Sequence, residues 1–217
     1  RGRNLVSNSH WTGPAQIIEA AARSFAMDKW ATQEDRVEVW VEKEALGGVL
    51  DSVCPALDVA YFCCKGYTSQ SEMWVASKRI LRNAKARQET TIIHLGDHDP
   101  SGIDMTRDIV DRLRTFTGAK INVDRIALNM DQVEKYNPPE NPAKTTDSRF
   151  NTYAAAFGDS SWELDALEPR LLRDLITKSV LKHRNDKSWE EAVEKEESFK
   201  AELASISENY IEIAANL

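Results

Sequence analysis

The stretch Asp97-His98-Asp99-Pro100-Ser101-Gly102 decides how this chain of 217 residues is interpreted. It follows an apolar run, Thr91-Ile92-Ile93-His94-Leu95-Gly96, that predicts a buried strand, and it precedes a periodic pattern that predicts a helix. Because side chains alternate along an extended backbone, an Asp-x-Asp sequence at the end of a strand places two carboxylates on one side of the chain. Two oxygen ligands in that position suit Mg²⁺ held against a phosphate.

The rest of the chain alternates strand patterns with helix patterns. Three further apolar runs predict strands, at residues 37–41, 59–64 and 121–128. Helices are expected over about 70–86 and 103–116, and a short helix is expected between residue 42 and the region of Pro55. Strands and helices that alternate at these lengths predict an α/β fold, with a mainly parallel four-stranded sheet covered by helices on both faces.

Two end segments flank this predicted domain of residues 37–183. Segment 1–36 contains a helix pattern at 14–27. Segment 184–217 predicts an amphipathic helical extension, and its apolar stripe consists of Phe199, Leu203, Ile206, Tyr210, Ile213 and Leu217. We expect the stripe to dock on the domain's own core rather than to form a dimer seam, because it is too short for several clear heptads. Within the domain, the proline-rich residues 137–142 predict a loop.

Composition limits the classes of protein to consider. A hydrophobic content of 41% and a charged content of 29% are ordinary for a globular protein, and no apolar run reaches the length of a membrane span. The net charge of −7 argues against a bulk electrostatic binder of nucleic acid. It does not exclude a DNA enzyme with a local basic face and a bound metal. Cys54, Cys63 and Cys64 lack metal-ligand spacing, which favours reduced core thiols in a cytosol-like compartment.

Glu42 adds a third carboxylate to the pattern. It ends another predicted parallel strand, as Asp97 and Asp99 do. If these two strands are neighbours, the three carboxylates meet at one edge of the sheet and repel each other unless a cation neutralises them. Oxygen donors without convergent thiolates favour Mg²⁺ as that cation.

Four motifs occur in a fixed order along the chain: Val41-Glu42-Lys43-Glu44-Ala45, Lys65-Gly66-Tyr67, Asp97-His98-Asp99-Pro100-Ser101-Gly102 and Glu163-Leu164-Asp165-Ala166-Leu167. In this order they resemble the Toprim fold, most closely that of the topoisomerase VI A subunit and its relative, the meiotic double-strand-break protein. Compact phage and bacterial proteins of this type are similar as well. The resemblance covers residues 37 to 176 approximately.

The resemblance implies that Glu42, Asp97 and Asp99 are catalytic and bind one or two Mg²⁺ ions, with Mn²⁺ as a substitute, beside the scissile phosphate of double-stranded DNA. In this family the nucleophile is a tyrosine on a winged-helix domain. Only 36 residues precede the first strand here, so no nucleophile is assigned in this chain, and we expect that domain to lie upstream of Arg1. The resemblance further implies a homodimer, a possible separate ATPase subunit, no membrane association, and the cytoplasm of a bacterial or phage-infected cell.

Further polar residues are candidates for metal support or DNA contact: Glu44, Lys65, Lys144, Arg149 and Glu163. Several residues near the predicted site also have an ordinary structural explanation. Glu44 suits a helix surface, and Glu163 suits either a fourth ligand or a charge at a helix start. Asp99 could act only as a helix cap. The basic end of the 70–86 helix suits a solvated face or a contact with DNA phosphates.

Three other functions stay open at this point. A self-contained Mg²⁺ nuclease would activate water and would need no tyrosine domain. A phosphatase of the haloacid-dehalogenase type also uses Asp-x-Asp after a strand, but Ser101 stands where such enzymes usually have Thr or Val, and Glu42 would be unexplained. A non-catalytic DNA-docking or dimerisation module would bind no Mg²⁺.

Overall fold

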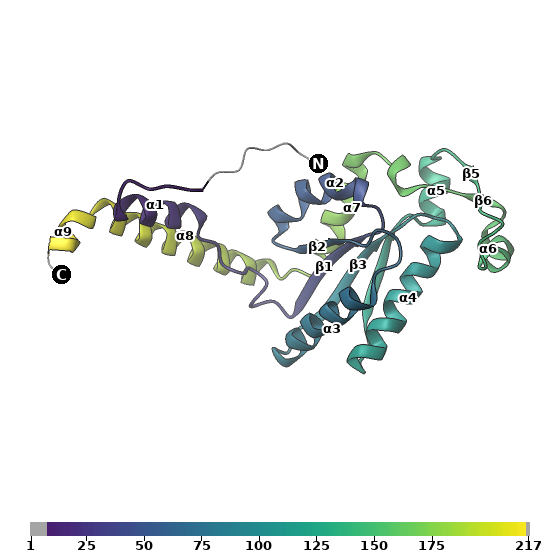
Figure 1. The fold of residues 1–217 in the computed structure, drawn as a ribbon, viewed down its shortest axis with the longest axis horizontal. Coiled ribbons are helices and arrows are strands. Elements are labelled where there is room, and N and C mark those ends of the chain that lie inside the picture. The colour runs from purple at the N-terminus through teal and green to yellow at the C-terminus, as the bar shows by residue number, and fades with distance from the viewer. Residues whose placement is uncertain (1–7, 216–217) are drawn as a thin grey trace. The chain divides into compact units, whose positions relative to one another are not determined.

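The computed structural model describes residues 8–215, so the predictions made for Arg1 and Leu217 lie outside the described residues. The chain divides into two compact units. Gln33–Asn185 forms the sheet unit, and the described parts of Arg1–Thr32 and Asp186–Leu217 form the helical unit (Figure 1). No helix among the described residues is long and apolar enough to cross a membrane.

The sheet unit contains the predicted four-stranded parallel sheet. Its strands are β1 (Asp35–Val41), β2 (Ala60–Cys63), β3 (Glu89–Leu95) and β4 (Asn122–Ala127), in the order β2-β1-β3-β4. All three pairings are parallel, which confirms the prediction. Strands β1 and β3 are adjacent and central, and they end in register with Val41 opposite Leu95. The carboxyl ends of these two strands therefore lie side by side.

Helices cover both faces of this sheet (Figure 1). On one face lie α3 (Gln70–Lys85) and α4 (Pro100–Thr117), and on the other lie α2 (Gly47–Val53) and α7 (Pro169–Leu181). The core on the first face contains Trp40, Met73, Ile92 and Leu113, all of them buried. Such two-sided burial is why β1 and β3 read as nearly continuous apolar runs. The helices expected at 70–86 and 103–116 are confirmed, and α4 begins three residues earlier, at Pro100.

The segment after β4 is more structured than the sequence suggested. It forms α5 (Met130–Tyr136) and α6 (Phe150–Phe157), followed by a short 3₁₀ turn, Leu164–Ala166, before α7. Two-residue strands β5 (Asn141–Pro142) and β6 (Ser160–Ser161) pair in antiparallel fashion. The expectation of an irregular loop over 137–142 is thus wrong for its last two residues, because a proline is tolerated in an edge strand of this kind.

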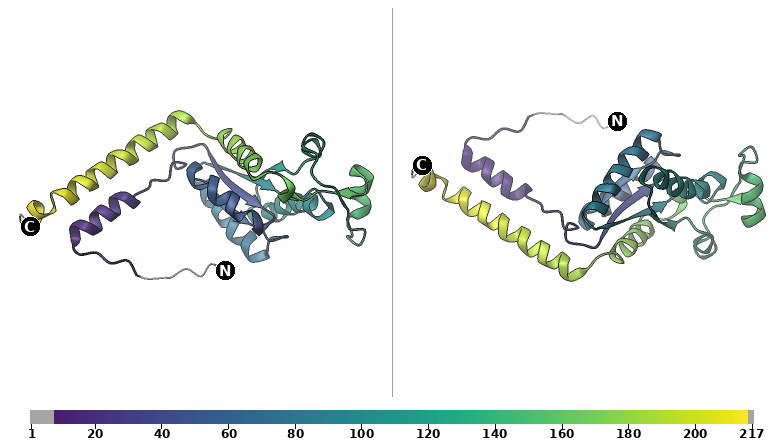
Figure 2. Two further views of the ribbon diagram at one scale, coloured as in Figure 1. Left: turned by 90° about the horizontal axis from the view of Figure 1, so that it is seen from above. Right: turned by 90° about the horizontal axis from the view of Figure 1, so that it is seen from below.

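In the helical unit, α1 (Pro14–Ser24) and α8 (Asp186–Glu208) pack side by side, and α9 (Tyr210–Ala215) follows (Figure 2). The rings of Phe25 and Phe199 meet edge to face, with centroids 6.0 Å apart. Glu196 accepts hydrogen bonds from the Met27 amide and the Lys29 ammonium, each at 2.7 Å. Phe199, a member of the stripe that we expected to dock on the domain core, therefore packs against the N-terminal helical segment, whereas Ile206 and Ile213 of the stripe are exposed. An amphipathic pattern shows that a face is buried, but not against which partner.

Candidate metal-binding site at the carboxyl edge of the sheet

Glu42 follows β1 directly, and its side chain lies over Gly96. A Cβ added to Gly96 would stand 2.9 Å from Glu42 Oε2 and 3.1 Å from Arg125 Nη1, so a larger residue there would displace these two side chains. Glu42 Oε2 also accepts a hydrogen bond of 2.9 Å from the Asp97 amide. Burial, together with the nearby charges of Asp97 and Asp99, raises the pKa of Glu42 to about 7. This carboxyl group is therefore costly to ionise in the folded chain.

Asp97 faces the segment that leads into α7. Its Oδ1 accepts a hydrogen bond of 2.7 Å from the Leu164 amide and lies 3.3 Å from Lys43 Nζ. Burial raises the pKa of Asp97 to about 6, although both of these contacts oppose the rise. The backbones of His98 and Trp162 exchange two hydrogen bonds, of 2.8 and 3.0 Å, and so hold this segment beside Asp97.

Asp99 caps α4, which is the ordinary role that the sequence left open for it. Its Oδ1 accepts hydrogen bonds from the Gly102 amide at 2.6 Å and from the Ser101 hydroxyl at 3.1 Å. The turn is tight, because a Cβ on Gly102 would stand only 2.3 Å from the Asp97 carbonyl oxygen. The glycine of the Asp-x-Asp-Pro-x-Gly stretch is therefore required by close backbone packing.

Arg125, on β4, is an important residue that sequence reasoning missed. Its guanidinium donates to the carbonyl oxygens of Gly96 at 3.0 Å, Asp97 at 2.6 Å and Gly102 at 2.9 Å. Burial lowers the pKa of Arg125 to about 10, and the charge of Glu42 is the main opposing influence. An arginine inside a predicted buried strand was the signal that could have revealed it, since buried charges are paired or hydrogen-bonded.

Lys43 belongs to the motif Val41-Glu42-Lys43-Glu44-Ala45, but it was not predicted as a site residue. Its ammonium contacts three carboxylates, those of Asp97, Glu163 and Asp165. Partial burial lowers the pKa of Lys43, but hydrogen bonds to Glu163 and Asp165 outweigh that effect and raise the pKa above its usual range. Glu163, which we considered as a fourth metal ligand, is thus a partner of this lysine.

Glu42, Asp97 and Asp99 lie at one edge of the sheet, as predicted, but their carboxylates do not converge. Among residues 8–215 there is no group of three or more His, Cys, Asp or Glu side chains that could hold a metal ion as placed. The reason is that Glu42 lies over Gly96, Asp97 reaches Leu164, and Asp99 caps its own helix. Magnesium usually keeps several waters and binds one or two carboxylates plus substrate phosphate. The oxygen donors, and the electrostatic interaction of Glu42 with Asp97 and Asp99, therefore fit an ion that is bound by one or two of these carboxylates.

The other predicted contact residues lie on the surface. Glu44 and Lys65 form an ion pair of 2.8 Å with each other, and both side chains are exposed. Lys144 is exposed on the loop before α6. The basic end of α3 lies at the opposite edge of the sheet from Asp97, because α3 ends at Lys85 and β3 begins at Glu89. It therefore does not adjoin the carboxylates.

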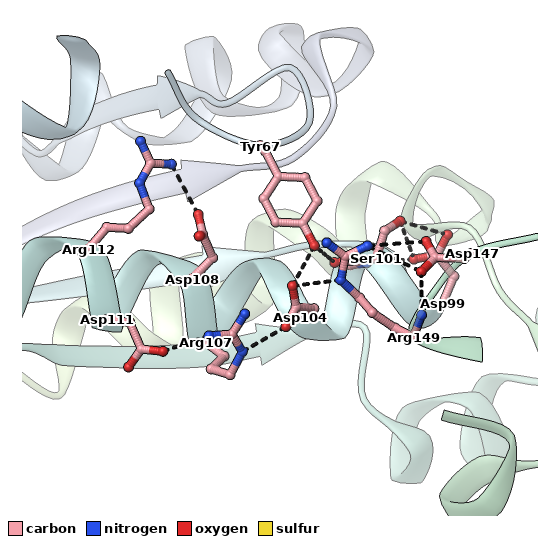
Figure 3. A network of polar contacts seen from close by, with 11 residues as sticks. Tyr67, Asp99, Ser101, Asp104, Arg107, Asp108, Asp111, Arg112, Asp147 and Arg149 are labelled. Atoms are coloured by element: carbon pink, nitrogen blue, oxygen red, sulfur yellow. Dashed lines mark hydrogen bonds and ion pairs between the residues drawn. The ribbon is translucent and has the colours of Figure 1, made fainter. Parts of the chain in front are cut away.

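Arg149 belongs to a separate polar network on the outer side of α4 (Figure 3). Its Nε donates to Asp104 at 2.8 Å, and its guanidinium lies over the Tyr67 ring, 5.0 Å from the centroid. The Tyr67 hydroxyl donates to Asp104 at 2.6 Å, and Arg107 donates to the same carboxylate at 2.7 Å. Although burial opposes it, these three donors lower the pKa of Asp104 to about 2.

Comparisons with protein-family models, with curated proteins and with solved structures found no match to this chain.

Proposed function

We propose that Gln33–Asn185 is a Toprim-type domain, the Mg²⁺-binding part of a DNA strand-cleaving protein of the topoisomerase VI A type. The observation that supports this most is the placement of Glu42, Asp97 and Asp99 immediately after two adjacent central strands. The four-stranded parallel sheet flanked by helices is consistent with such a domain. The substrate that we propose is double-stranded DNA, and we propose that the protein acts as a homodimer.

The charge balance at this edge supports a cation site. Two cationic side chains, Lys43 and Arg125, interact with carboxylates of this site. Lys43 also contacts Glu163 and Asp165. The guanidinium of Arg125 donates hydrogen bonds to backbone carbonyl oxygens. Residual negative charge in a buried site favours a divalent cation. When bound there, Mg²⁺ polarises a phosphate and stabilises the charge that develops on the leaving oxygen.

The protein's own residues have separable roles in this proposal. Glu42, Asp97 and Asp99 hold the ion. Where the Glu42 carboxyl group is not bound to the ion, its pKa of about 7 would let it keep a proton near neutral pH and deliver it to a leaving oxygen. Arg125 positions the loop by binding the carbonyl oxygens of Gly96, Asp97 and Gly102.

We propose that the nucleophile is a tyrosine of a separate domain, and we assign none in this chain. The hydroxyl groups of Tyr61 and Tyr67 donate to carboxylates, and that bonding, together with burial, raises their pKa values. Tyr153 is buried, and burial raises its pKa also. These hydroxyl groups are therefore held in the neutral form, which makes them weak nucleophiles.

Titration calorimetry with Mg²⁺ tests the metal-binding half of the proposal. The wild-type chain should bind Mg²⁺, and Glu42→Gln and Asp97→Asn should each abolish measurable binding. Glu44→Gln is the matched control, because it removes an exposed acid near the same edge that pairs only with Lys65 among the described residues. Wild-type protein that binds no Mg²⁺, or Glu42→Gln protein that binds normally, would contradict the proposal.

Cleavage of supercoiled plasmid in Mg²⁺ or Mn²⁺ separates this proposal from a water-using nuclease. The raised pKa of Glu42 is the observation that favours the second candidate, since such a group can act as a general base near neutral pH. Nicking by the chain alone that disappears in Glu42→Gln, with no protein linked to the DNA, identifies the nuclease. Mg²⁺ binding without nicking supports the metal-binding part of a larger enzyme.

A further inference from the structure

The ammonium group of Lys43 joins a buried carboxylate to two exposed ones. It lies 3.3 Å from Asp97 Oδ1 and 2.9 Å from Asp165 Oδ1, and Glu163 is a third partner. The Asp97 side chain is 9% exposed, whereas those of Glu163 and Asp165 are 49% and 44% exposed. The contact to the buried acid is longer than the contact to Asp165. Lys43 therefore has both a weaker partner inside the site and stronger partners at its rim.

The two rim acids are held in place by the backbone. They flank Leu164, whose amide donates to Asp97, and the adjacent Trp162 pairs with His98. Lys43 itself follows Glu42 directly in the chain. The two alternative positions for the ammonium, on Asp97 and at the rim, are thus built from segments that are fixed relative to each other. A small rotation of the lysine side chain changes how the charge is shared.

We infer that Lys43 is a built-in counter-ion that competes with Mg²⁺ for Asp97, and that Glu163 and Asp165 receive its ammonium when the ion binds. This inference rests on the proposed function. A divalent ion at Asp97 repels an ammonium a few ångströms away, and the repulsion is strong in a partly buried site. The rim acids keep the displaced ammonium paired, so its displacement leaves no unpaired buried charge. Lys43 is in this way a positioning residue that sets the affinity for the metal.

The same ion pairs have a purely structural alternative, in which Lys43 only ties the segment before α7 to the Asp97 loop. The two roles differ in how the affinity for Mg²⁺ responds to substitution. Competition requires that loss of the lysine strengthen metal binding, and that loss of the rim acids weaken it only while the lysine is present. A structural tie requires neither.

Titration calorimetry with Mg²⁺ on the full chain tests this with Lys43→Met, the double variant Glu163→Gln/Asp165→Asn, and the triple variant. We expect Lys43→Met to bind Mg²⁺ about five- to tenfold more tightly, and the double variant to bind several-fold more weakly. The triple variant should match Lys43→Met within about twofold, because the rim acids act through the lysine. Lys187→Met, which removes an exposed lysine of the helical unit, should leave the affinity unchanged.

Thermal melts and circular dichroism accompany the titrations, so that loss of folding is recognised. Unchanged or weaker binding by folded Lys43→Met would overturn the inference, and so would a triple variant weakened as much as the double variant. If Lys43→Met fails to fold, the double variant decides, since normal affinity there contradicts the inference. Wild-type protein that binds no Mg²⁺ would overturn the proposed function as well, whereas normal wild-type binding with an unchanged variant overturns this inference alone.

Discussion

Two polar clusters lie near the start of α4. The pKa values of Glu42 and Asp97 in the first are raised, whereas that of Asp104 in the second is lowered. The inner acids, Glu42, Asp97 and Asp99, lie at the sheet edge, where burial raises the pKa of the first to about 7 and of the second to about 6. The outer network is the part of the polar contacts in Figure 3 that surrounds Asp104, namely Tyr67, Asp104, Arg107 and Arg149. Its carboxylate, Asp104, has a pKa of about 2.

These pKa values differ because Asp104 accepts more hydrogen bonds from charged and hydroxyl side chains than the inner acids do. Asp104 receives bonds from Arg107, Arg149 and Tyr67, so its ionised form stabilises the folded chain. The inner acids have mainly backbone amides and a shared ammonium, because the guanidinium of Arg125 binds carbonyl oxygens instead. Ionisation of Glu42 and of Asp97 therefore costs folding free energy. Perturbed carboxylates of this kind are common at functional sites, and the four predictions that follow test the contrast.

The largest effect is expected for Arg125→Met. This change removes the buried donor for the carbonyl oxygens of Gly96, Asp97 and Gly102 and leaves the inner acids with less compensation. We expect a loss of about 3–5 kcal/mol in the free energy of unfolding, because breaking a buried charge network leaves groups unpaired. Urea denaturation measures it. A loss below about 1 kcal/mol would show that the guanidinium is not required to organise the inner acids.

Glu42→Gln should stabilise the chain at pH 8 in the presence of a metal chelator, by about 2 kcal/mol. The folded pKa of Glu42, about 7, exceeds its ordinary value of 4.5, so ionisation disfavours folding. Ionisation of Glu42 therefore lowers the stability of the wild type as the pH rises from about 4.5 through 7, and the variant lacks this contribution. The amide oxygen of glutamine can still accept from the Asp97 amide.

Urea titrations at pH 4.5, 6 and 8 measure this gain. It should be near zero at the lowest pH and complete above pH 7. A variant that is less stable than the wild type at pH 8 would mean that neighbouring donors and cations stabilise the ionised Glu42 carboxylate in the folded chain.

The backbone of the inner site was predictable from sequence, and its side chains were not. Apolar runs located β1 and β3, and the alternation of strands and helices predicted that Glu42 and Asp97 would end parallel strands. Beyond the end of a strand, however, side-chain direction depends on what packs there. The segment around Leu164, more than sixty residues further along the chain, binds the Asp97 carboxylate through the Leu164 amide, whereas Glu42 binds the Asp97 amide.

The same limit explains the other residues that were missed or reassigned. A single arginine in a strand gives no indication that its donors reach three carbonyl oxygens on another segment, as those of Arg125 do. The predicted DNA contact of Arg149 stays a prediction, and its pairing with Asp104 of α4 could not be read from the loop sequence around it. Local patterns show which residues are buried or charged, and long-range packing decides which residues pair.

A smaller effect is expected for Asp104→Asn in the outer network. The folded pKa of Asp104 is depressed to about 2, so its ionised form contributes stability that is present above its ordinary pKa near 4 and is lost as the pH falls toward 2. We expect a loss of about 1 kcal/mol at pH 7, because Arg107 and Arg149 are exposed enough for solvent to screen the pairs. Urea denaturation at pH 7 and acid titration of both proteins measure it. Equal stability of the two proteins at pH 7 would show that the hydrogen bonds to ionised Asp104 do not stabilise the folded chain.

The smallest effect is expected for Arg107→Gln. The Arg107 side chain is 61% exposed, and Asp104 keeps its bonds to Arg149 and Tyr67 without it. We expect a loss of at most about 0.5 kcal/mol that disappears in 1 M NaCl, where exposed pairs are screened. Parallel urea titrations of Arg125→Met at both salt concentrations give the comparison, since its buried loss should persist in salt. If the two arginine substitutions had similar size and salt dependence, burial would not be what separates the inner acids from the outer network.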